Sequence, residues 1–85
     1  MSNKEITTIV REILLRDWDP CGVGDNNVLA NEYDEYLPAI VEMVFQRTSS
    51  SAINEALIKF EKELGVALPE KQREHAVQAL SAIRP

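Results

Sequence analysis

The sequence predicts an all-α fold, a compact bundle of four helices with short connections. Two observations lead to this prediction. Apolar residues recur at spacings of three and four in four separate segments, which places them on one face of a helix. Proline, glycine and serine residues stand between these segments, where they favour turns and helix ends. No internal repeat divides the chain, so residues 1–85 are predicted to form a single helical domain.

The first predicted helix covers residues 4–17. Its apolar stripe consists of Ile6, Ile9, Val10, Ile13 and Leu14. Ser2 or Asn3 can cap its start, because a short polar side chain accepts a hydrogen bond from a free backbone N–H of the first turn. Pro20 ends the helix, since the residue before a proline, here Asp19, is disfavoured in the α conformation.

The second predicted helix covers residues 32–46. Its apolar positions are Tyr33, Tyr36, Leu37, Ile40, Val41, Val44 and Phe45. Pro38 has no backbone N–H to donate to the carbonyl of Asp34, so the first turns of this segment are predicted to be irregular.

The third predicted helix is capped by Ser50 or Ser51 and ends at Leu64. Its buried face would carry Ile53, Leu57, Phe60 and Leu64, and its outer face would carry Lys59, Glu61, Lys62 and Glu63. Gly65 follows directly and predicts a left-handed C-terminal cap.

The fourth predicted helix runs from Pro69, at its first position, to about Ile83. Its buried stripe would be Ala76, Val77, Leu80 and Ile83.

The composition argues against several function classes. The net charge is −5 and the lysines and arginines are scattered singly, whereas binding to nucleic acid or to an anionic membrane needs clustered cations. No apolar run approaches the roughly 18 residues of a membrane span, and Glu5, Arg11 and Glu12 interrupt the N-terminal segment, which is unlike a signal peptide. The single cysteine precludes an internal disulfide. We therefore expect a cytoplasmic protein that binds neither nucleic acid nor membrane.

Residues 16–36 hold six of the fourteen acidic residues and resemble a calcium loop in part. With Asp17 at position one of an EF-hand loop, Asp19, Gly22 and Asp25 fall at the expected positions. Position five is Cys21, a poor ligand for calcium, and position twelve is Val28, where the loop requires a bidentate glutamate. With two oxygen ligands missing, we predict no metal site and no cofactor.

No catalytic group stands out in the sequence. Cys21 and His75 are far apart in the chain, and nothing in the pattern brings them together. We therefore predict that the protein is not an enzyme. A small ion-binding or enzymatic module remains an alternative, as does a housekeeping protein with another partner. The carboxylates that such a module would use are Asp17, Asp19, Asp25, Glu32 and Asp34.

The same segment contains a predicted structural turn made by Trp18, Pro20 and Gly22. We expect Trp18 to close the core, because a large aromatic side chain at a helix end buries much apolar area. Cys21 is expected to be a small apolar packing residue beside the turn.

The motif WDPCGV at residues 18–23, followed by EYDEY at residues 32–36, resembles a known pattern. It is similar to the W-D-P-x-G-V turn and E-Y-D-x-Y helix start of a YugE-like group of small bacterial proteins of unknown function. The resemblance covers residues 10–45. It departs from the pattern at Cys21, where an apolar residue is usual, and at Glu35, where glycine is usual. The resemblance implies a compact helical module; some small bacterial proteins of this style are immunity partners of secreted toxin domains.

We therefore expect an acidic module that binds a basic protein partner. The best candidate is an immunity protein that neutralises a bacterial toxin domain, such as a basic nuclease, by covering its active or substrate-binding surface. The predicted partner-binding residues are Asp17, Asp19, Asp25, Glu32, Tyr33, Asp34, Glu35 and Tyr36.

Overall fold

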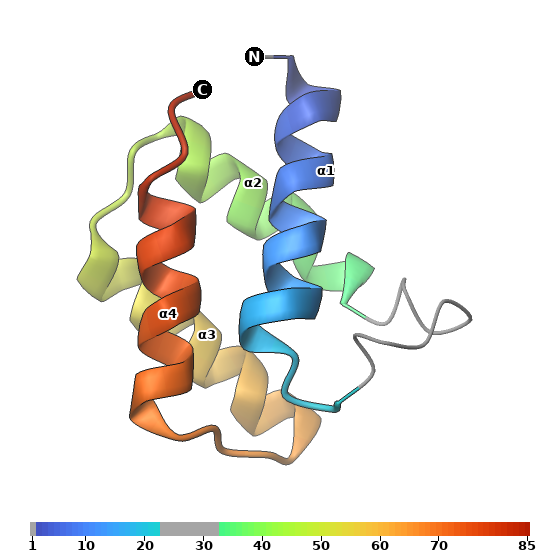
Figure 1. The fold of residues 1–85 in the computed structure, drawn as a ribbon, viewed down its shortest axis with the longest axis vertical. Helices are drawn as coiled ribbons and strands as arrows, with labels where there is room; N and C mark the ends of the chain where they lie inside the picture. The colour runs from blue at the N-terminus through green and yellow to red at the C-terminus, as the bar shows by residue number, and fades with distance from the viewer. Residues whose placement is uncertain (1, 23–32) are drawn as a thin grey trace.

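A computed structural model describes residues 2–22 and 33–85 of the chain. All regular secondary structure in these residues is helical, which confirms the all-α prediction (Figure 1). The elements in chain order are helix α1 (Asn3–Ile13), the π-helix η1 (Leu14–Trp18), the 3-10 turn η3 (Asp34–Tyr36), and helices α2 (Leu37–Phe45), α3 (Ser50–Leu64) and α4 (Glu70–Ser81).

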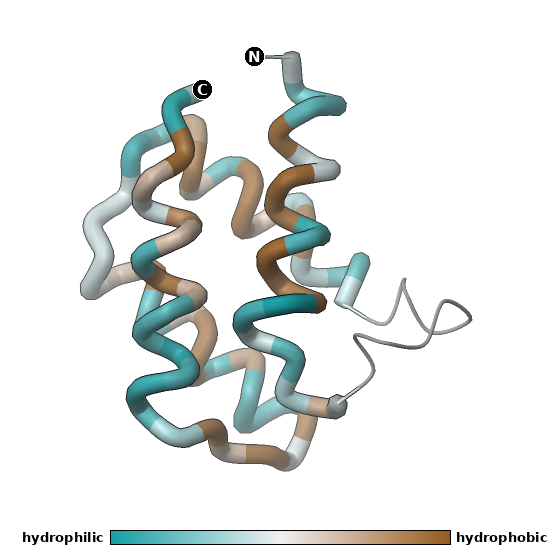
Figure 2. The backbone as a smooth tube through the Cα atoms, viewed as in Figure 1, coloured by the Kyte–Doolittle hydropathy of each residue, from teal (hydrophilic) through white to brown (hydrophobic). Residues whose placement is uncertain are grey.

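The helices pack around one core. Helix α1 packs against α2, and α4 packs against α3 and against η1, so α1 and α4 lie side by side with both termini at the same end (Figure 1). The apolar stretches of α1, α2 and the C-terminal half of α4 supply most of this interior (Figure 2). The buried apolar side chains are Ile6, Val10, Ile13, Leu14, Trp18, Tyr33, Tyr36, Leu37, Ile40, Val41, Val44, Ile53, Leu57, Ala76, Val77 and Leu80.

Two of the three capped helix ends follow the sequence prediction. The Ser2 hydroxyl caps α1 by accepting the backbone N–H of Glu5 at 3.2 Å. Gly65 adopts the left-handed conformation at φ 77° and caps α3. The cap of α3 was predicted one or two residues too late, at Ser50 or Ser51, because the cap is Ser49, whose hydroxyl accepts the backbone N–H of Ala52. In a run of three serines the sequence gives no signal that distinguishes the capping one.

The first helix changes its hydrogen-bonding pattern before it ends. From Leu14 the chain forms a π-helix, which closes with a bond of 2.7 Å from the backbone N–H of Asp19 to the carbonyl of Leu14. Leu14 and Trp18 are both buried in this π-helical segment, where regular α-helix was predicted to residue 17. Asp19 then takes a left-handed conformation at φ 36°, which aspartate tolerates better than most residues do. The prediction that the helix ends at Asp19-Pro20 is confirmed.

The two prolines at helix starts behave differently. Pro38 lies in the first turn of α2, after the 3-10 turn η3, so the predicted irregular start is confirmed. Pro69 was predicted at the first helical position of α4, but it is the residue before the helix, with an extended ψ of 140°. Helix α4 ends at Ser81, so Ile83 packs on the core from beyond the helix.

Candidate functional site

Trp18 is the centre of an aromatic cluster. Its side chain is fully buried, and its ring lies 5.3 Å from that of Tyr33, 6.1 Å from that of Tyr36 and 6.5 Å from that of Phe60, measured between centroids. The rings of Tyr36 and Phe60 are stacked at 4.3 Å. The cluster joins η1, η3 and α3, so Trp18 and residues 33–36 meet at one place in the core.

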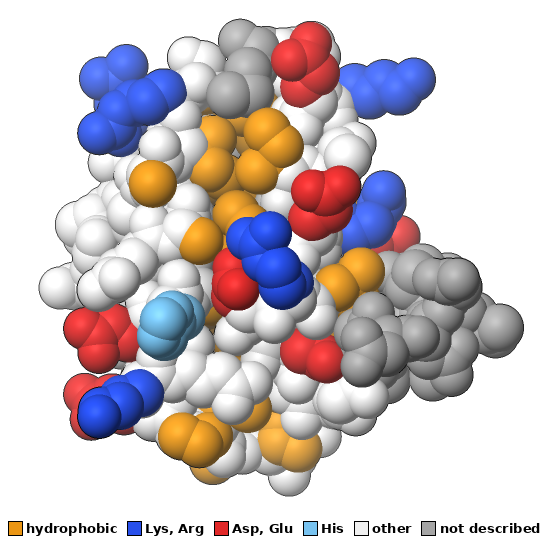
Figure 3. Space-filling model, in the orientation of Figure 1, with side chains coloured by type: hydrophobic (Ala, Val, Ile, Leu, Met, Phe, Trp, Pro, Cys, Tyr) orange, Lys and Arg blue, Asp and Glu red, His pale blue; other side chains and the backbone are white. Residues whose placement is uncertain are grey.

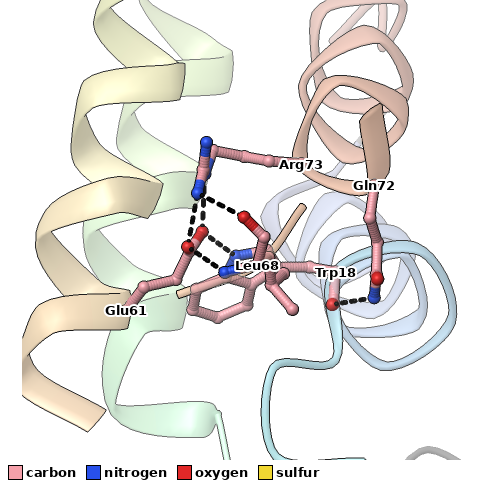
Figure 4. Close-up of polar contacts among 5 residues, drawn as sticks. All are labelled: Trp18, Glu61, Leu68, Gln72 and Arg73. Carbon is pink, nitrogen blue, oxygen red and sulfur yellow. Dashed lines mark hydrogen bonds and ion pairs between the residues drawn. The ribbon is translucent and has the colours of Figure 1, made fainter. Parts of the chain in front are cut away.

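A buried carboxylate lies beside this cluster. The indole N–H of Trp18 donates to Glu61 Oε2 at 3.0 Å, and the backbone N–H of Leu68 donates to Glu61 Oε1 at 2.9 Å (Figure 4). The guanidinium of Arg73 donates to both oxygens, at 2.7 Å from Nε and 2.6 Å from Nη2. Glu61 is 2% exposed, so the prediction that it faces outward was wrong.

The position of Glu61 in the chain carries a signal for its burial. It follows Ile53 and Leu57 at spacings of four, and both of these residues are buried. The stripe therefore continues through Glu61, and the sequence interpretation gave more weight to its charge than to its register. A carboxylate on an apolar stripe needs a cationic or N–H partner, and Arg73 supplies one from α4.

The ionisation of Glu61 follows from its hydrogen bonds. Burial by itself favours the neutral acid, but the bonds from Arg73, from the Leu68 backbone and from Trp18 outweigh it, so the pKa of Glu61 lies below its ordinary value. Each carboxylate oxygen accepts two hydrogen bonds, which occupies its main acceptor directions. This carboxylate is thus a structural tie among η1, α3 and α4 rather than a group free to exchange protons.

A second hydrogen-bonded pair fixes the ends of the turn. The Tyr33 hydroxyl donates to Asp19 Oδ1 at 2.8 Å and accepts the backbone N–H of Cys21 at 2.8 Å. Burial is the largest cause that raises the pKa of Tyr33, with the Asp19 carboxylate adding to it. Gly22 is left-handed at φ 67°. Cys21 is exposed, so the expectation that it packs in the interior was wrong; its backbone, not its thiol, serves the turn.

The predicted partner-binding acids mostly have intramolecular partners. Asp17 is paired with Arg16 at 2.9 Å, Asp34 with Arg11 at 3.0 Å, and Asp19 accepts the Tyr33 hydroxyl. Glu35 is exposed, and its carboxylate interacts with the Tyr36 hydroxyl, while Asp25 and Glu32 lie outside the described residues.

The predicted tyrosines are core residues in the structure. Tyr33 is 2% exposed and Tyr36 is 6% exposed, and burial raises the pKa of Tyr36 as it does that of Tyr33. The role of this segment in partner binding stays a prediction. Among residues 2–22 and 33–85, no three His, Cys, Asp or Glu side chains are grouped in a way that could hold a metal ion.

A surface groove between α1 and α2 was not foreseen from the sequence. It has a volume of about 450 Å³ and is lined by Asn3, Thr7, Leu37, Pro38, Val41, Glu42, Phe45 and Gln46. Phe45, the last apolar position of the predicted second helix, is 38% exposed, because it lies at the last position of α2, beyond the end of the core face. The groove thus combines an exposed aromatic ring with a polar rim.

The charge of the chain is divided unevenly between its two halves. Residues 1–46, the acidic half, contain three basic and nine acidic residues. Residues 47–85 contain six basic and five acidic residues. The acidic half includes α1, η1, η3 and α2, and it therefore contains both walls of the α1–α2 groove.

No protein-family model, curated protein or solved structure matches the chain. In the part of the chain that the structure describes, no helix has the length and apolar character needed to cross a bilayer.

Proposed function

We propose that the protein is a protein-binding module whose acidic half binds a basic protein partner. The observation that carries this proposal is the position of the α1–α2 groove within the half that holds the whole excess of acidic residues. Exposed aromatic side chains in apolar depressions are typical anchors of protein interfaces, and a polar rim is typical of their surroundings. Phe45 fits the first role, and Glu42 lies on the rim.

Charge indicates the kind of partner. The described residues that line the groove include the acid Glu42 and neither lysine nor arginine. Glu35 and Glu42 are both exposed and are seven residues apart, so they project to similar sides of the η3–α2 segment. A partner that places an apolar side chain against Phe45 and cations beside these carboxylates would match both features, and the charges would speed its encounter.

The most specific form of the proposal is an immunity protein. Such a protein neutralises a bacterial toxin domain, here a basic nuclease, by covering its active or substrate-binding surface. A nuclease surface that binds phosphates is cationic, and the acidic half has the opposite charge. The predicted partner-binding segment, residues 17–36, belongs to this same half and would extend the contact.

The test asks whether the carboxylates that speed association with the partner lie on the acidic half. The gene neighbourhood is inspected for an adjacent secreted toxin gene, and the encoded toxin domain is the binding probe. The double variant Glu35→Gln with Glu42→Gln should slow association at low salt by about threefold to tenfold. The matched control, Glu55→Gln with Glu74→Gln, removes the same number of exposed charges from α3 and α4 and should leave the association rate within about twofold of the parent's.

Two results would count against the proposal. Equal slowing by the two double variants would mean that net charge, rather than the acidic half, governs binding. A gene neighbourhood without a toxin gene, or a toxin whose activity the protein leaves unchanged, would overturn the immunity form.

A further inference from the structure

A separate pocket lies where the end of α2, the start of α3 and the end of α4 meet, and it has a volume of about 220 Å³. Its floor includes the buried side chains of Val44, Ile53 and Leu80, so the core fixes its position. Its polar lining residues are Arg47, Thr48, Ser49, Ser50, Ser81 and Arg84. In the space-filling view, basic side chains gather at the upper left, near the place where Figure 1 marks the C-terminus (Figure 3).

The charge of this pocket is opposite to that of the whole chain. The net charge of the chain is −5, yet the described residues that line the pocket include Arg47 and Arg84 and no Asp or Glu. Arg47 follows α2 and Arg84 follows α4, so folding brings these two cations to one pocket. Two like charges repel each other, and an anion bound between them would replace the repulsion by attraction.

Both guanidinium groups keep hydrogen-bond donors for a ligand. The side chain of Arg47 forms no hydrogen bond or ion pair with the residues that the structure describes. Nη1 of Arg84 lies 3.4 Å from the carbonyl oxygen of Ser81, which engages only one of its N–H groups. The hydroxyl oxygens of Ser50 and Ser81 are 3.0 Å apart, so one donates to the other, and the accepting hydroxyl keeps its own hydrogen for another acceptor.

The backbone of Arg47 indicates that its side chain has a purpose. Helices α2 and α3 end in the same kind of cap. After α2, the backbone N–H groups of Arg47 and Thr48 donate to carbonyls of the last turn at 3.1 and 3.0 Å, and after α3 those of Gly65 and Val66 do so at 3.2 and 3.0 Å. Gly65 is left-handed at φ 77°, which glycine adopts without strain, whereas Arg47 is left-handed at φ 54°, where a side chain is disfavoured. Backbone strain of this kind is concentrated at functional positions.

We propose that this pocket binds phosphate, as the free ion or as the terminal group of a small ester, between Arg47 and Arg84. A guanidinium presents two parallel N–H donors that match two oxygens of a phosphate. The hydroxyl pair of Ser50 and Ser81 supplies a further donor. The volume is below the roughly 300 Å³ at which pockets for drug-sized ligands begin, so it suits a phosphate with a short organic group. The pocket shares no lining residue with the α1–α2 groove, and the inference does not depend on the proposed function.

The experiment titrates the isotope-labelled full chain with sodium phosphate, up to about 50 mM, and follows the backbone amide signals, with sodium chloride added to hold the ionic strength constant. Saturable shifts should appear at residues 47–50 and 81–84. A parallel titration with glycerol phosphate distinguishes the two sources of the group. Tighter binding of the ester would identify a small phosphorylated molecule whose carbon atoms contact the apolar floor, and equal binding would identify the free ion.

Two variants remove one guanidinium each. Arg47→Gly and Arg84→Gln should each raise the Kd for phosphate by about fivefold or more. Arg47→Gly should also keep or raise the Tm, because glycine relieves the left-handed strain. A loss of binding without a loss of stability would show that the arginine serves the ligand rather than the fold.

Two controls are matched to these variants. Lys71→Gln removes an exposed cation of α4 outside the pocket and should change the Kd for phosphate by less than about twofold. Gly65→Arg places an arginine in the equivalent cap of α3, where a Cβ would meet no atom within 4 Å. It should lower the Tm through backbone strain and leave the Kd unchanged.

Three results would overturn the proposal. The first is the absence of saturable shifts at residues 47–50 and 81–84 with both phosphate and its ester. The second is a Kd that neither Arg47→Gly nor Arg84→Gln alters. The third is an equal rise of the Kd in Lys71→Gln, because general attraction to cations would then explain the binding. Both arginines are exposed, so circular dichroism should confirm that the variants fold.

Discussion

Two bidentate ion pairs in this molecule have nearly the same chemistry and different surroundings. Arg73 donates through Nε and Nη2 to Glu61, whose side chain is 2% exposed, while its own is 11% exposed. Arg11 donates through the same two atoms to Asp34, but these side chains are 41% and 36% exposed. The first pair also receives the Trp18 indole and the Leu68 backbone N–H, whereas the second lies at the surface between α1 and η3.

The difference shows that burial, rather than the geometry of the pair, decides what depends on it. A buried carboxylate has no water to replace a lost partner, so removal of one group leaves several others unsatisfied. An exposed pair exchanges its partner for solvent at little cost. We therefore expect the network around Glu61 to control folding, and the Arg11–Asp34 pair to contribute little.

The largest effect should come from Trp18→Ala. This change removes the fully buried ring that contacts Tyr33, Tyr36 and Phe60 and leaves a cavity among them. We expect the free energy of unfolding to fall by about 3–5 kcal/mol, a large share of the stability of a domain this small. Urea denaturation would measure it. Phe45→Ala is the matched aromatic control, since Phe45 is exposed, and it should cost less than about 1 kcal/mol.

A Trp18→Ala variant that unfolds at the same urea concentration as the parent would place Trp18 outside the core. Loss of partner binding in such a variant would assign Trp18 to an interface instead.

Glu61→Gln should have the next largest effect. The amide keeps the shape of the side chain, but it places N–H donors where the carboxylate accepted them, and it leaves the Arg73 guanidinium without a counter-charge. We expect a loss of about 2–4 kcal/mol in the free energy of unfolding. Glu55→Gln, an exposed position on the same helix, should stay within about 0.5 kcal/mol of the parent. Equal free energies of unfolding for Glu61→Gln and Glu55→Gln would show that the buried network adds nothing to stability beyond an exposed charge.

Much of this arrangement can be predicted from the sequence. Apolar spacing locates all four α-helices, and Gly65 and Pro20 mark two of their ends, because these residues restrict the backbone locally. The π-helical turn at Leu14–Trp18 is not predictable in this way, since neither the apolar spacing nor a glycine or proline within the segment distinguishes it from the end of an α-helix.

The candidate site was harder to predict than the fold. Acidity in residues 17–36 suggested a displayed surface, whereas Asp17, Asp19 and Asp34 each bond to a neighbour in the folded chain. Such pairings depend on which side chains the fold brings together, and sequence spacing does not specify this for residues on different helices. The α1–α2 groove was missed for the same reason, because its walls come from two helices far apart in the chain.

The response to acid should test the buried network around Glu61. The pKa of Glu61 is lowered in the folded protein relative to its ordinary value, so the unfolded chain binds this proton at a higher pH than the folded chain does. The stabilisation from this group is therefore complete above the unfolded pKa, and it is lost as the pH falls through the folded pKa. Thermal unfolding should be followed between about pH 6 and pH 2. The difference in melting temperature between the parent and Glu61→Gln should become smaller toward low pH. A constant gap would show that the proton affinity of Glu61 is unchanged by folding.

The smallest effect should come from Arg11→Gln, which tests the exposed pair. Both partners are more than one-third exposed, so water can solvate the Asp34 carboxylate when the guanidinium is removed. We expect a loss of no more than about 1 kcal/mol in the free energy of unfolding, and a smaller loss at high salt. A double-mutant cycle that combines Arg11→Gln with Asp34→Asn should give a coupling energy of about 0.2–1 kcal/mol. Lys59→Gln, which removes an exposed positive charge from α3, is the control for the single Arg11→Gln variant. A coupling of about 3 kcal/mol would instead make this pair equivalent to Glu61–Arg73, and burial would then not be what separates the two. The same cycle has a structural use, because the Arg11–Asp34 pair is a polar contact between α1 and the start of η3. Weak coupling there would mean that η3 is held mainly by the rings of Tyr33 and Tyr36 in the core.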